Sequence, residues 1–261
     1  MSVLFLSVFI QPLYAVDTET GFVEDPGRKN LALLVGVSHG LFGIDKDIKN
    51  IENLIKHPAY QYRPVILQED MGTHQRISKE LEALSRQLAE LSSLFFYFSG
   101  HGDVGVLMVQ DMKMKISELR ASIEMGRQGL PPIERLVMMF DSCYSGSLLD
   151  PIRASIPVYF EKGEIQNLYF VESVVNEFVG GSEVSYWKKL FAFASSRADQ
   201  TSFASPDGSH FTLALLKAFD EAAKQGGTVS EFIQKTHDYT QGHNPIARVI
   251  PASWNQEKVV P

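Results

Sequence analysis

Two residues that could perform nucleophilic chemistry, Cys143 and His101, each follow shortly after an apolar run of the sequence. A thiol is only slightly ionised at neutral pH, and a neighbouring imidazole can take its proton. A cysteine and a histidine held side by side are therefore the minimum needed for acyl transfer. Taken one at a time, the alternatives are a buried apolar cysteine and a hydrogen-bonded loop histidine.

Cys143 is the only cysteine among the 261 residues. A disulfide within the chain and a multi-thiolate zinc site are both excluded by that count. Glycines flank the two candidate residues: Gly100 and Gly102 surround His101, and Gly146 follows Cys143. Glycine lets the backbone turn sharply and approach a substrate closely. The backbone N–H groups of Gly102 and Cys143 could then form an oxyanion hole.

The strands and helices that must position these residues are indicated by the pattern of apolar residues along the chain. Continuous apolar runs predict buried strands at 31–37, 64–67, 94–98, 136–140 and 190–194. Helical spacing of apolar residues predicts helices at 47–55, 73–91, 116–126, 211–223 and 229–239. This alternation predicts an α/β fold, a three-layer sandwich with a mostly parallel central sheet. Sites in such folds lie beyond the carboxyl ends of the strands, where both His101 and Cys143 are expected.

The composition and net charge of the chain limit the classes of function that can be expected. The chain is 44% hydrophobic and 21% charged, as is typical of a globular protein. Its net charge of −7 gives a nucleic-acid partner no electrostatic support, so we expect none.

The amino-terminal region is predicted to be separate from the folded domain. Residues 1–15 are apolar and uncharged, too short to span a bilayer, and end in Ala15. They predict a signal peptide without its basic region, and hence a periplasmic or secreted protein with no stable membrane insertion. The alternative is an apolar strand in a cytoplasmic protein. A polar linker is expected at 16–30 and one domain at 31–261, with an insertion at about 147–189.

Two short motifs resemble a known family. Ser99-Gly100-His101-Gly102 and Asp141-Ser142-Cys143-Tyr144-Ser145-Gly146 are similar to the catalytic motifs of caspase/metacaspase-like cysteine peptidases, peptidase family C14. The match is to the metacaspase and bacterial caspase-like branch, although Tyr144 stands where metacaspases often have histidine. Further similar stretches lie at 33–37, 46–54, 193–202 and 208–212.

The resemblance implies a caspase-hemoglobinase-like fold and a peptidase mechanism. Cys143 would attack the scissile carbonyl to form a thioester, while His101 moves the proton and activates water. It implies a peptide or protein substrate, a monomer, and no metal or organic cofactor in the chemistry.

The resemblance also implies which residues bind substrate. Asp47 and Asp141 would line a pocket for Arg or Lys before the cleaved bond, and Ser195 and Ser196 belong to a stretch that would bind substrate. Two carboxylates in one pocket would select a basic side chain by charge. The alternatives are a helix N-cap for Asp47 and a loop-orienting role for Asp141.

Two further expectations concern regulation. Some metacaspases bind calcium through acidic residues after the histidine. This chain has only Asp103 and Asp111 there, so we expect no calcium requirement. The insertion holds four basic residues at which self-cleavage is conceivable, and an uncut insertion is the alternative. They are Arg153, Lys162, Lys188 and Lys189.

One hypothesis from another class stays open. A caspase-like module with weak catalysis could bind peptides or partners instead of cleaving them. A metal site built from His101, Cys143 and Asp141 is disfavoured because it would offer three ligands without the usual spacing.

Overall fold

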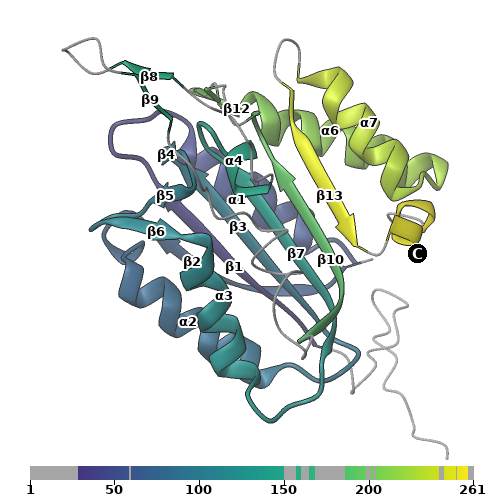
Figure 1. Ribbon diagram of the computed structural model, residues 1–261. Coiled ribbons are helices and arrows are strands. Elements are labelled where there is room, and N and C mark those ends of the chain that lie inside the picture. The colour runs from purple at the N-terminus through teal and green to yellow at the C-terminus, as the bar shows by residue number, and fades with distance from the viewer. Residues whose placement is uncertain are drawn as a thin grey trace, which may run out of the picture.

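The computed structural model describes residues 29–58, 60–149, 157–159, 165–167, 186–197, 201–202, 204–240, 244–250 and 252–257. Their centre is a six-stranded sheet with the strand order β13-β10-β7-β3-β1-β2 (Figure 1). The strands are β1 (Asn30–Val37), β2 (Tyr62–Gln68), β3 (Ser93–Gly100), β7 (Ile133–Asp141), β10 (Trp187–Ala194) and β13 (Ile246–Ile250). Every neighbouring pair is parallel except β10 and β13. The predicted mostly parallel sheet is thus confirmed.

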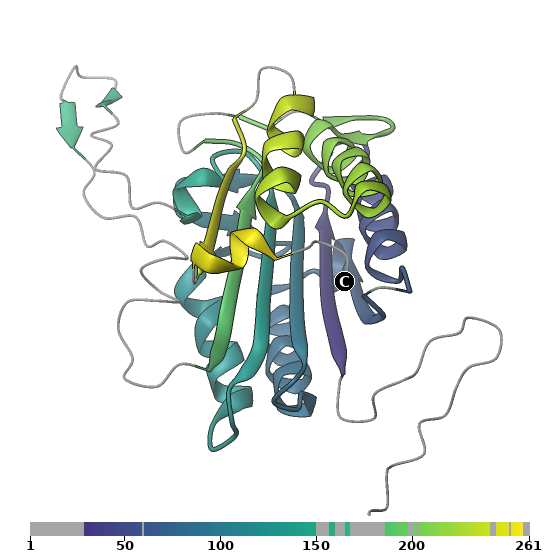
Figure 2. The same cartoon turned by 90° about the vertical axis from the view of Figure 1, so that its right-hand side faces the viewer.

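Helices cover both faces of this sheet, as the alternating pattern predicts (Figures 1 and 2). The helices are α1 (Ile44–Ile55), α2 (His74–Gln87), α3 (Ile116–Arg127), α4 (Gly146–Leu149), α6 (His210–Gln225) and α7 (Val229–Tyr239), with 3-10 turns η1 (Glu69–Met71) and η2 (Ala252–Gln256). Smaller strands are β4 (Gly102–Asp103), β5 (Val106–Met108), β6 (Lys113–Lys115), β8 (Pro157–Tyr159), β9 (Ile165–Asn167), β11 (Ala204–Ser205) and β12 (Gly208–Ser209).

The two faces of the sheet bury two separate cores. On one face, α2 and α3 pack against alternate strand residues such as Phe96 and Phe140. On the other face, α1, α6, α7 and η2 pack against the intervening residues, such as Phe95 and Phe193. Strand side chains point alternately to opposite faces, so a strand that feeds both cores must be apolar throughout. This is why continuous apolar runs located the strands.

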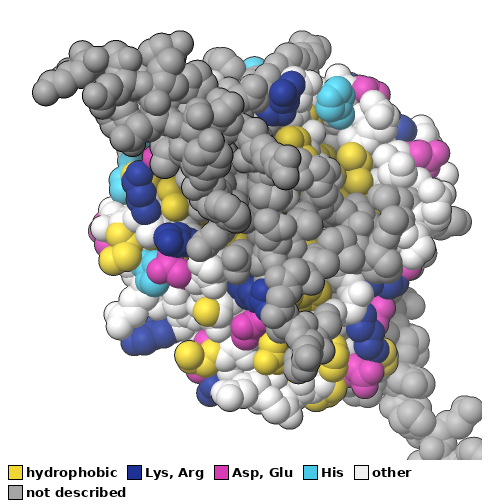
Figure 3. All heavy atoms as spheres, viewed as in Figure 1, with side chains coloured by type: hydrophobic (Ala, Val, Ile, Leu, Met, Phe, Trp, Pro, Cys, Tyr) yellow, Lys and Arg dark blue, Asp and Glu magenta, His cyan; other side chains and the backbone are white. Residues whose placement is uncertain are grey.

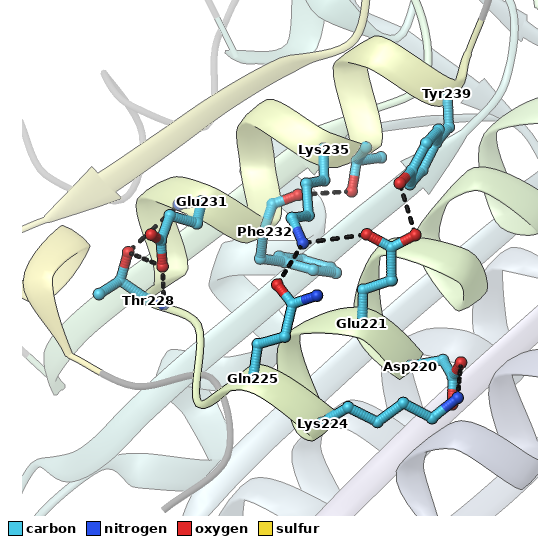
Figure 4. Close-up of polar contacts among 10 residues, drawn as sticks. Asp220, Glu221, Lys224, Gln225, Thr228, Glu231, Phe232, Lys235 and Tyr239 are labelled. Atoms are coloured by element: carbon cyan, nitrogen blue, oxygen red, sulfur yellow. Dashed lines mark hydrogen bonds and ion pairs between the residues drawn. The ribbon is translucent and has the colours of Figure 1, made fainter.

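The α6–α7 pair is held together by polar contacts on its outer surface (Figure 4). Glu221 of α6 accepts hydrogen bonds from Lys235 at 2.9 Å and from Tyr239 at 2.6 Å, both on α7. Thr228 caps α7, and Glu231 reaches back to its backbone N–H at 2.7 Å. This capping box explains why α7 begins at Val229, as the sequence predicts.

Several boundaries differ from the prediction. Helix α1 begins at Ile44, and its N-cap is Gly43 with φ of 82°, so Asp47 is not a helix cap. The conformation favours glycine, and a glycine cap gives no polar signal in the sequence. Lys188 and Lys189 lie within β10 and form ion pairs with Glu90 and Glu257, at 2.8 and 2.6 Å. They are therefore not part of an insertion.

The predicted leader and most of the insertion lie outside the described residues, as do Arg153 and Lys162. The predicted linker does too, except for its last two residues: Lys29 is described, and Asn30 opens β1. At the other end of the insertion, 147–149 belong to α4. The insertion can therefore occupy at most 150–186.

In the part of the chain with a described fold, none of the helices is both long enough and apolar enough to cross a membrane. Nor do these residues contain a group of three or more His, Cys, Asp or Glu side chains suited to hold a metal ion. On the face shown in Figure 3, basic and acidic side chains of the described residues are interspersed.

Candidate active site

The register of the two central strands places Cys143 and His101 at the same edge of the sheet. Strands β3 and β7 are parallel neighbours, and Ser99 lies opposite Asp141 in their register. His101 and Cys143 each follow two residues later. Both side chains are half-buried. The predicted meeting of two motifs, 42 residues apart in the sequence, thus rests on adjacent strands that end level with each other.

Direct contact between the two motifs is visible at Gly102. A Cβ atom added to Gly102 would lie 2.5 Å from the carbonyl oxygen of Cys143 and 2.6 Å from Oγ of Ser142. Only a glycine fits at such a distance. The backbone that follows His101 therefore lies against the backbone of Cys143, as an oxyanion hole built from Gly102 and Cys143 would need.

Buried serine hydroxyl groups at the end of β10 hold the loop that carries Cys143 in place. Ser195 and Ser196, 1% and 0% exposed, follow directly after β10. Ser195 Oγ accepts a hydrogen bond from Ser142 N at 3.2 Å, and Ser196 Oγ donates to Ser142 O at 3.2 Å. Both hydroxyls also lie 3.3 Å from Ser145 Oγ. The two serines thus position the Cys143 loop, and their burial gives no support to the prediction that they touch substrate.

The turn after the nucleophile is held in a rare backbone conformation. Tyr144 has φ of 56°, in the left-handed region that few non-glycine residues adopt. Its carbonyl oxygen accepts hydrogen bonds from Ser147 N at 2.9 Å and Ser147 Oγ at 2.6 Å. These bonds link the strained turn to the first residues of α4 and so fix the direction in which Cys143 leaves β7.

The thiol and the imidazole have neighbours that sequence reasoning missed. Cys143 Sγ lies 3.9 Å from the carbonyl oxygen of Ser202, to which the thiol donates a weak hydrogen bond. The ring of His101 faces the ring of His39, which follows β1, with 6.4 Å between the ring centroids. His39 is itself bound through Nε2 to Val109 O at 3.2 Å. This edge therefore holds two imidazoles.

Asp47 and Asp141 come together in one buried polar cluster behind the nucleophile. They are 0% and 4% exposed. Ser209 bonds both carboxylates: its N–H donates to Asp47 Oδ1 at 2.7 Å, and its hydroxyl donates to Asp141 Oδ2. The predicted pairing of these acids is thus visible, 94 residues apart in the sequence.

Hydroxyl groups fill the remaining acceptor positions of the two acids. Asp47 Oδ2 accepts from Ser99 Oγ at 3.0 Å. Asp141 accepts from Ser202 Oγ at 3.2 Å, Thr212 Oγ1 at 2.9 Å and Tyr97 OH at 3.4 Å. Every carboxylate oxygen of the pair therefore has a donor, which is what makes the burial of two acids tolerable.

Burial dominates the ionisation of this pair. Desolvation and the neighbouring Asp141 raise the pKa of Asp47 to about 8, against the pull of its hydrogen bonds from Ser209 and Ser99. Burial also raises the pKa of Asp141, although its hydrogen bonds from Ser209, Thr212 and Ser202 act in the opposite direction. The two carboxyl groups therefore hold a proton at neutral pH more readily than ordinary aspartates.

Ser202 connects the two parts of the site. Its carbonyl oxygen contacts the thiol of Cys143, and its hydroxyl bonds Asp141. It is half-buried, whereas both acids are buried. A group that reaches the acids from the nucleophile would pass this residue.

A parallel sheet covered on both faces, with a cysteine and a histidine beyond its two central strands, has the architecture of the caspase-hemoglobinase class. The caspase domain family, Peptidase C14, matches residues 29–244 of the chain. The chain therefore belongs to this family of cysteine-type peptidases, as the two motifs predict.

Curated relatives and solved structures agree with this assignment. Metacaspase-1 of Meyerozyma guilliermondii is 31% identical over 168 residues, which cover 54% of this chain and 40% of the relative. Metacaspase-1 of Pyricularia oryzae is 25% identical over 279 residues, covering 82% and 69%. The chain thus spans about 40% of the length of several fungal metacaspases that it matches.

Two solved structures share the fold at low identity. Protein GSU0716 from Geobacter sulfurreducens has a TM-score of 0.63 and 14% identity, over 90% of this chain and 98% of that one. Caspase-1 from Spodoptera frugiperda has a TM-score of 0.53 and 13% identity, over 85% and 86%. At such identities the likeness concerns the fold alone.

Proposed function

We propose that the chain is an active cysteine endopeptidase, with Cys143 as nucleophile and His101 as the base. One observation carries the proposal: β3 and β7 end level with each other, and Gly102 lies against the Cys143 backbone. This arrangement supports a single rim for the residues that follow the two strands, at which a thiol and an imidazole would serve one carbonyl group.

The chemistry follows in two balanced steps. Cys143 Sγ attacks the carbonyl carbon of the peptide, and its proton passes to His101. The C–N bond breaks as His101 gives that proton to the leaving amine, which leaves a thioester. His101 then takes a proton from water, the hydroxide attacks the thioester, and the C–S bond breaks. The carboxylic acid product leaves and the thiol regains its proton. The N–H groups of Gly102 and Cys143 would stabilise the oxyanion.

The two imidazoles at this rim allow a sharp test. Because the chain has one cysteine, a peptidyl fluoromethyl ketone that adds to a thiol can label Cys143 alone. We expect intact-mass spectrometry to show stoichiometric labelling of the wild type, loss in His101→Gln, and retention in the matched variant His39→Gln. An unreactive Cys143 in the folded wild type would instead favour the peptide-binding module.

Cleavage after Arg or Lys is the finer part of the proposal. Its support is the cluster of Asp47 and Asp141, which Ser202 links to the nucleophile: its hydroxyl bonds Asp141 and its carbonyl oxygen contacts the Cys143 thiol. If a substrate guanidinium entered this cluster, the two carboxylates would accept its charge-assisted hydrogen bonds in place of the weaker ones from the hydroxyl groups. It would also favour the ionised form of both acids, which burial disfavours.

A panel of fluorogenic peptides that differ only before the cut tests this specificity. We expect cleavage after Arg and Lys, and a drop in kcat/KM of at least about tenfold in Asp141→Asn, since one charge-assisted bond is lost. Asp220→Asn is the matched control, because Asp220 is an exposed aspartate whose carboxylate pairs with Lys224 on α6. Efficient cleavage after Asp, with none after Arg, would contradict the basic pocket.

A further inference from the structure

A second cavity lies at the opposite end of the sheet from Cys143. It measures about 140 Å³ and is open to solvent on one side. Aromatic side chains dominate its wall, among them Tyr62, Phe95, Phe219 and Trp254, and the one charged lining residue is Arg135. Arg135 lies near the amino end of β7, and the cavity extends from there along the strand as far as Met139, four residues before Cys143.

A row of polar side chains crosses the sheet beside this cavity, and two of its members, Tyr62 and Arg135, line the cavity. The register aligns Tyr62, Asn30, Ser93, Arg135 and Lys189 on β2, β1, β3, β7 and β10. Aligned residues of parallel strands face the same side of the sheet. Tyr62 and Arg135 both line the cavity, so Asn30 and Ser93, which lie between them in the row, face this side too.

Three consecutive members of the row have a buried polar atom without a hydrogen-bond partner among the described residues. They are Asn30 Oδ1, Ser93 Oγ and Arg135 Nε. Asn30 and Ser93 are only 8% and 1% exposed, and the second polar atom of Asn30, Nδ2, donates to Tyr60 O at 2.6 Å. An unpartnered buried polar group costs free energy, and native proteins retain few of them. Two of the three atoms, Ser93 Oγ and Arg135 Nε, can act as donors, and Arg135 is the one of these residues that lines the cavity.

The charges in this row indicate that an anion would fit beside it. Arg135 lies directly opposite Lys189, and like charges in that position repel. Lys189 is neutralised by Glu257 at 2.6 Å and faces Glu134 at 3.6 Å. Arg135 has no such carboxylate among the described residues. Burial raises the pKa of Tyr60, so its phenol stays neutral and cannot supply the anion.

We infer that this cavity binds a small aromatic carboxylate, with its ring among the aromatic side chains and its carboxylate on Arg135. The guanidinium of Arg135 is the one charged group of the lining, and it can donate to both carboxylate oxygens. A cavity of about 150 Å³ is known to accept benzene, so 140 Å³ suits one ring with a short acid side chain. The site is separate from the peptidase centre and does not depend on the proposed function.

Phenylacetate and its neutral analogue 2-phenylethanol test the inference. Trp254 lines the cavity, whereas Trp187 belongs to the core on the other face, so the variant Trp187→Phe leaves one reporter of fluorescence. We expect saturable quenching of Trp254, with phenylacetate binding about tenfold more tightly than 2-phenylethanol because of its charge-assisted bonds. Phenethylammonium should bind more weakly than either.

Arg135→Met should remove the difference between phenylacetate and 2-phenylethanol, while Arg76→Met on the exposed side of α2 should preserve it. Arg135→Met removes an unpartnered charge, so its thermal midpoint should equal or exceed that of the wild type. Labelling of Cys143 by the fluoromethyl ketone should be unaffected by phenylacetate. Equal affinities for acid and alcohol in the wild type, an unchanged difference in Arg135→Met, or no saturable binding would overturn the inference.

Discussion

The two ends of the central sheet treat buried polar groups in opposite ways. At the carboxyl ends of the strands, both carboxylates of the Asp47–Asp141 pair are fully hydrogen-bonded by the chain itself. At the amino ends, the row at Asn30, Ser93 and Arg135 leaves three polar atoms without partners. Both sets are buried, so burial alone does not explain the difference. A fully bonded cluster fixes a loop for chemistry, whereas an unfilled row is suited to receive a ligand.

The largest effect is expected where the two motifs touch at the carboxyl end. In Gly102→Ala, the added Cβ would lie 2.5 Å from Cys143 O, so the Cys143 loop must move. We expect kcat/KM to fall by about 10²-fold or more, because small displacements of catalytic groups are costly. Gly129→Ala is the control: its φ of 75° also disfavours alanine, yet a Cβ there meets nothing within 4 Å. Equal activities of the two variants would show that the contact at Gly102 is not needed.

The next effect concerns the residue that bonds both acids. Ser209→Ala removes the hydroxyl that donates to Asp141 and that also accepts from Thr212 N at 2.9 Å, as the N-cap of α6. We expect the free energy of unfolding to fall by about 2–4 kcal/mol, since a buried carboxylate loses a donor and a helix loses its cap. Chemical denaturation would measure this. A loss below about 1 kcal/mol would mean that the cluster is not as tightly bonded as its geometry implies.

Stability measured as a function of pH would reveal the ionisation of the buried Asp47–Asp141 pair. Folding raises the pKa of Asp47 from about 3.8 to about 8, so the folded protein keeps a proton that the unfolded chain has released. The protonated Asp47 therefore contributes its full amount to the free energy of unfolding below about pH 4. This contribution declines as the pH rises towards 8.

Asp47→Asn lacks this decline, so its stability relative to the wild type should increase between pH 5 and pH 9, by roughly 1–3 kcal/mol. Urea unfolding at pH 5, 7 and 9 would measure the difference. Asp220→Asn, at an exposed position of α6, should run parallel to the wild type. Parallel profiles for all three proteins would show that Asp47 titrates normally.

The smallest effect is also the most direct test of the contrast between the two ends. Ser99 and Ser93 both lie on β3 and are both 1% exposed, but Ser99 bonds Asp47 and Ser93 Oγ has no described partner. Ser99→Ala should lower the free energy of unfolding by about 1–2 kcal/mol, and Ser93→Ala should change it by less than about 0.5 kcal/mol. Similar losses in thermal unfolding would mean that Ser93 has a partner after all.

The sequence predicted those parts of the structure that follow from local patterns. Continuous apolar runs located five of the six central strands: β1, β3, β7 and β10 contribute to both cores, and the edge strand β2, although mostly half-buried, has an apolar run at 64–67. Strand β13 was missed because it is a short, antiparallel edge strand without such a run. The meeting of the His101 and Cys143 motifs was predictable, since it needs only two strands to be neighbours.

The surroundings of the site were not predictable in the same way. Ser202, Ser209 and Thr212 reach Asp141 from 61 to 71 residues away, and a serine in a loop carries no signal of its target. The cavity at Arg135 likewise depends on the register of five strands, which no single segment encodes. Long-range hydrogen bonding and exact alignment of strands are properties of the packed molecule.

A buried arginine links α2 and α3, the two helices on the face of the sheet opposite α6 and α7. Arg127, the last residue of α3, is 0% exposed and donates to the carbonyl oxygens of Ser85 at 2.9 Å and Leu88 at 2.7 Å, at the end of α2. Neither helix can detach alone without breaking these charge-assisted hydrogen bonds. The amide protons of α2 and α3 should therefore exchange with solvent deuterium as one cooperative unit.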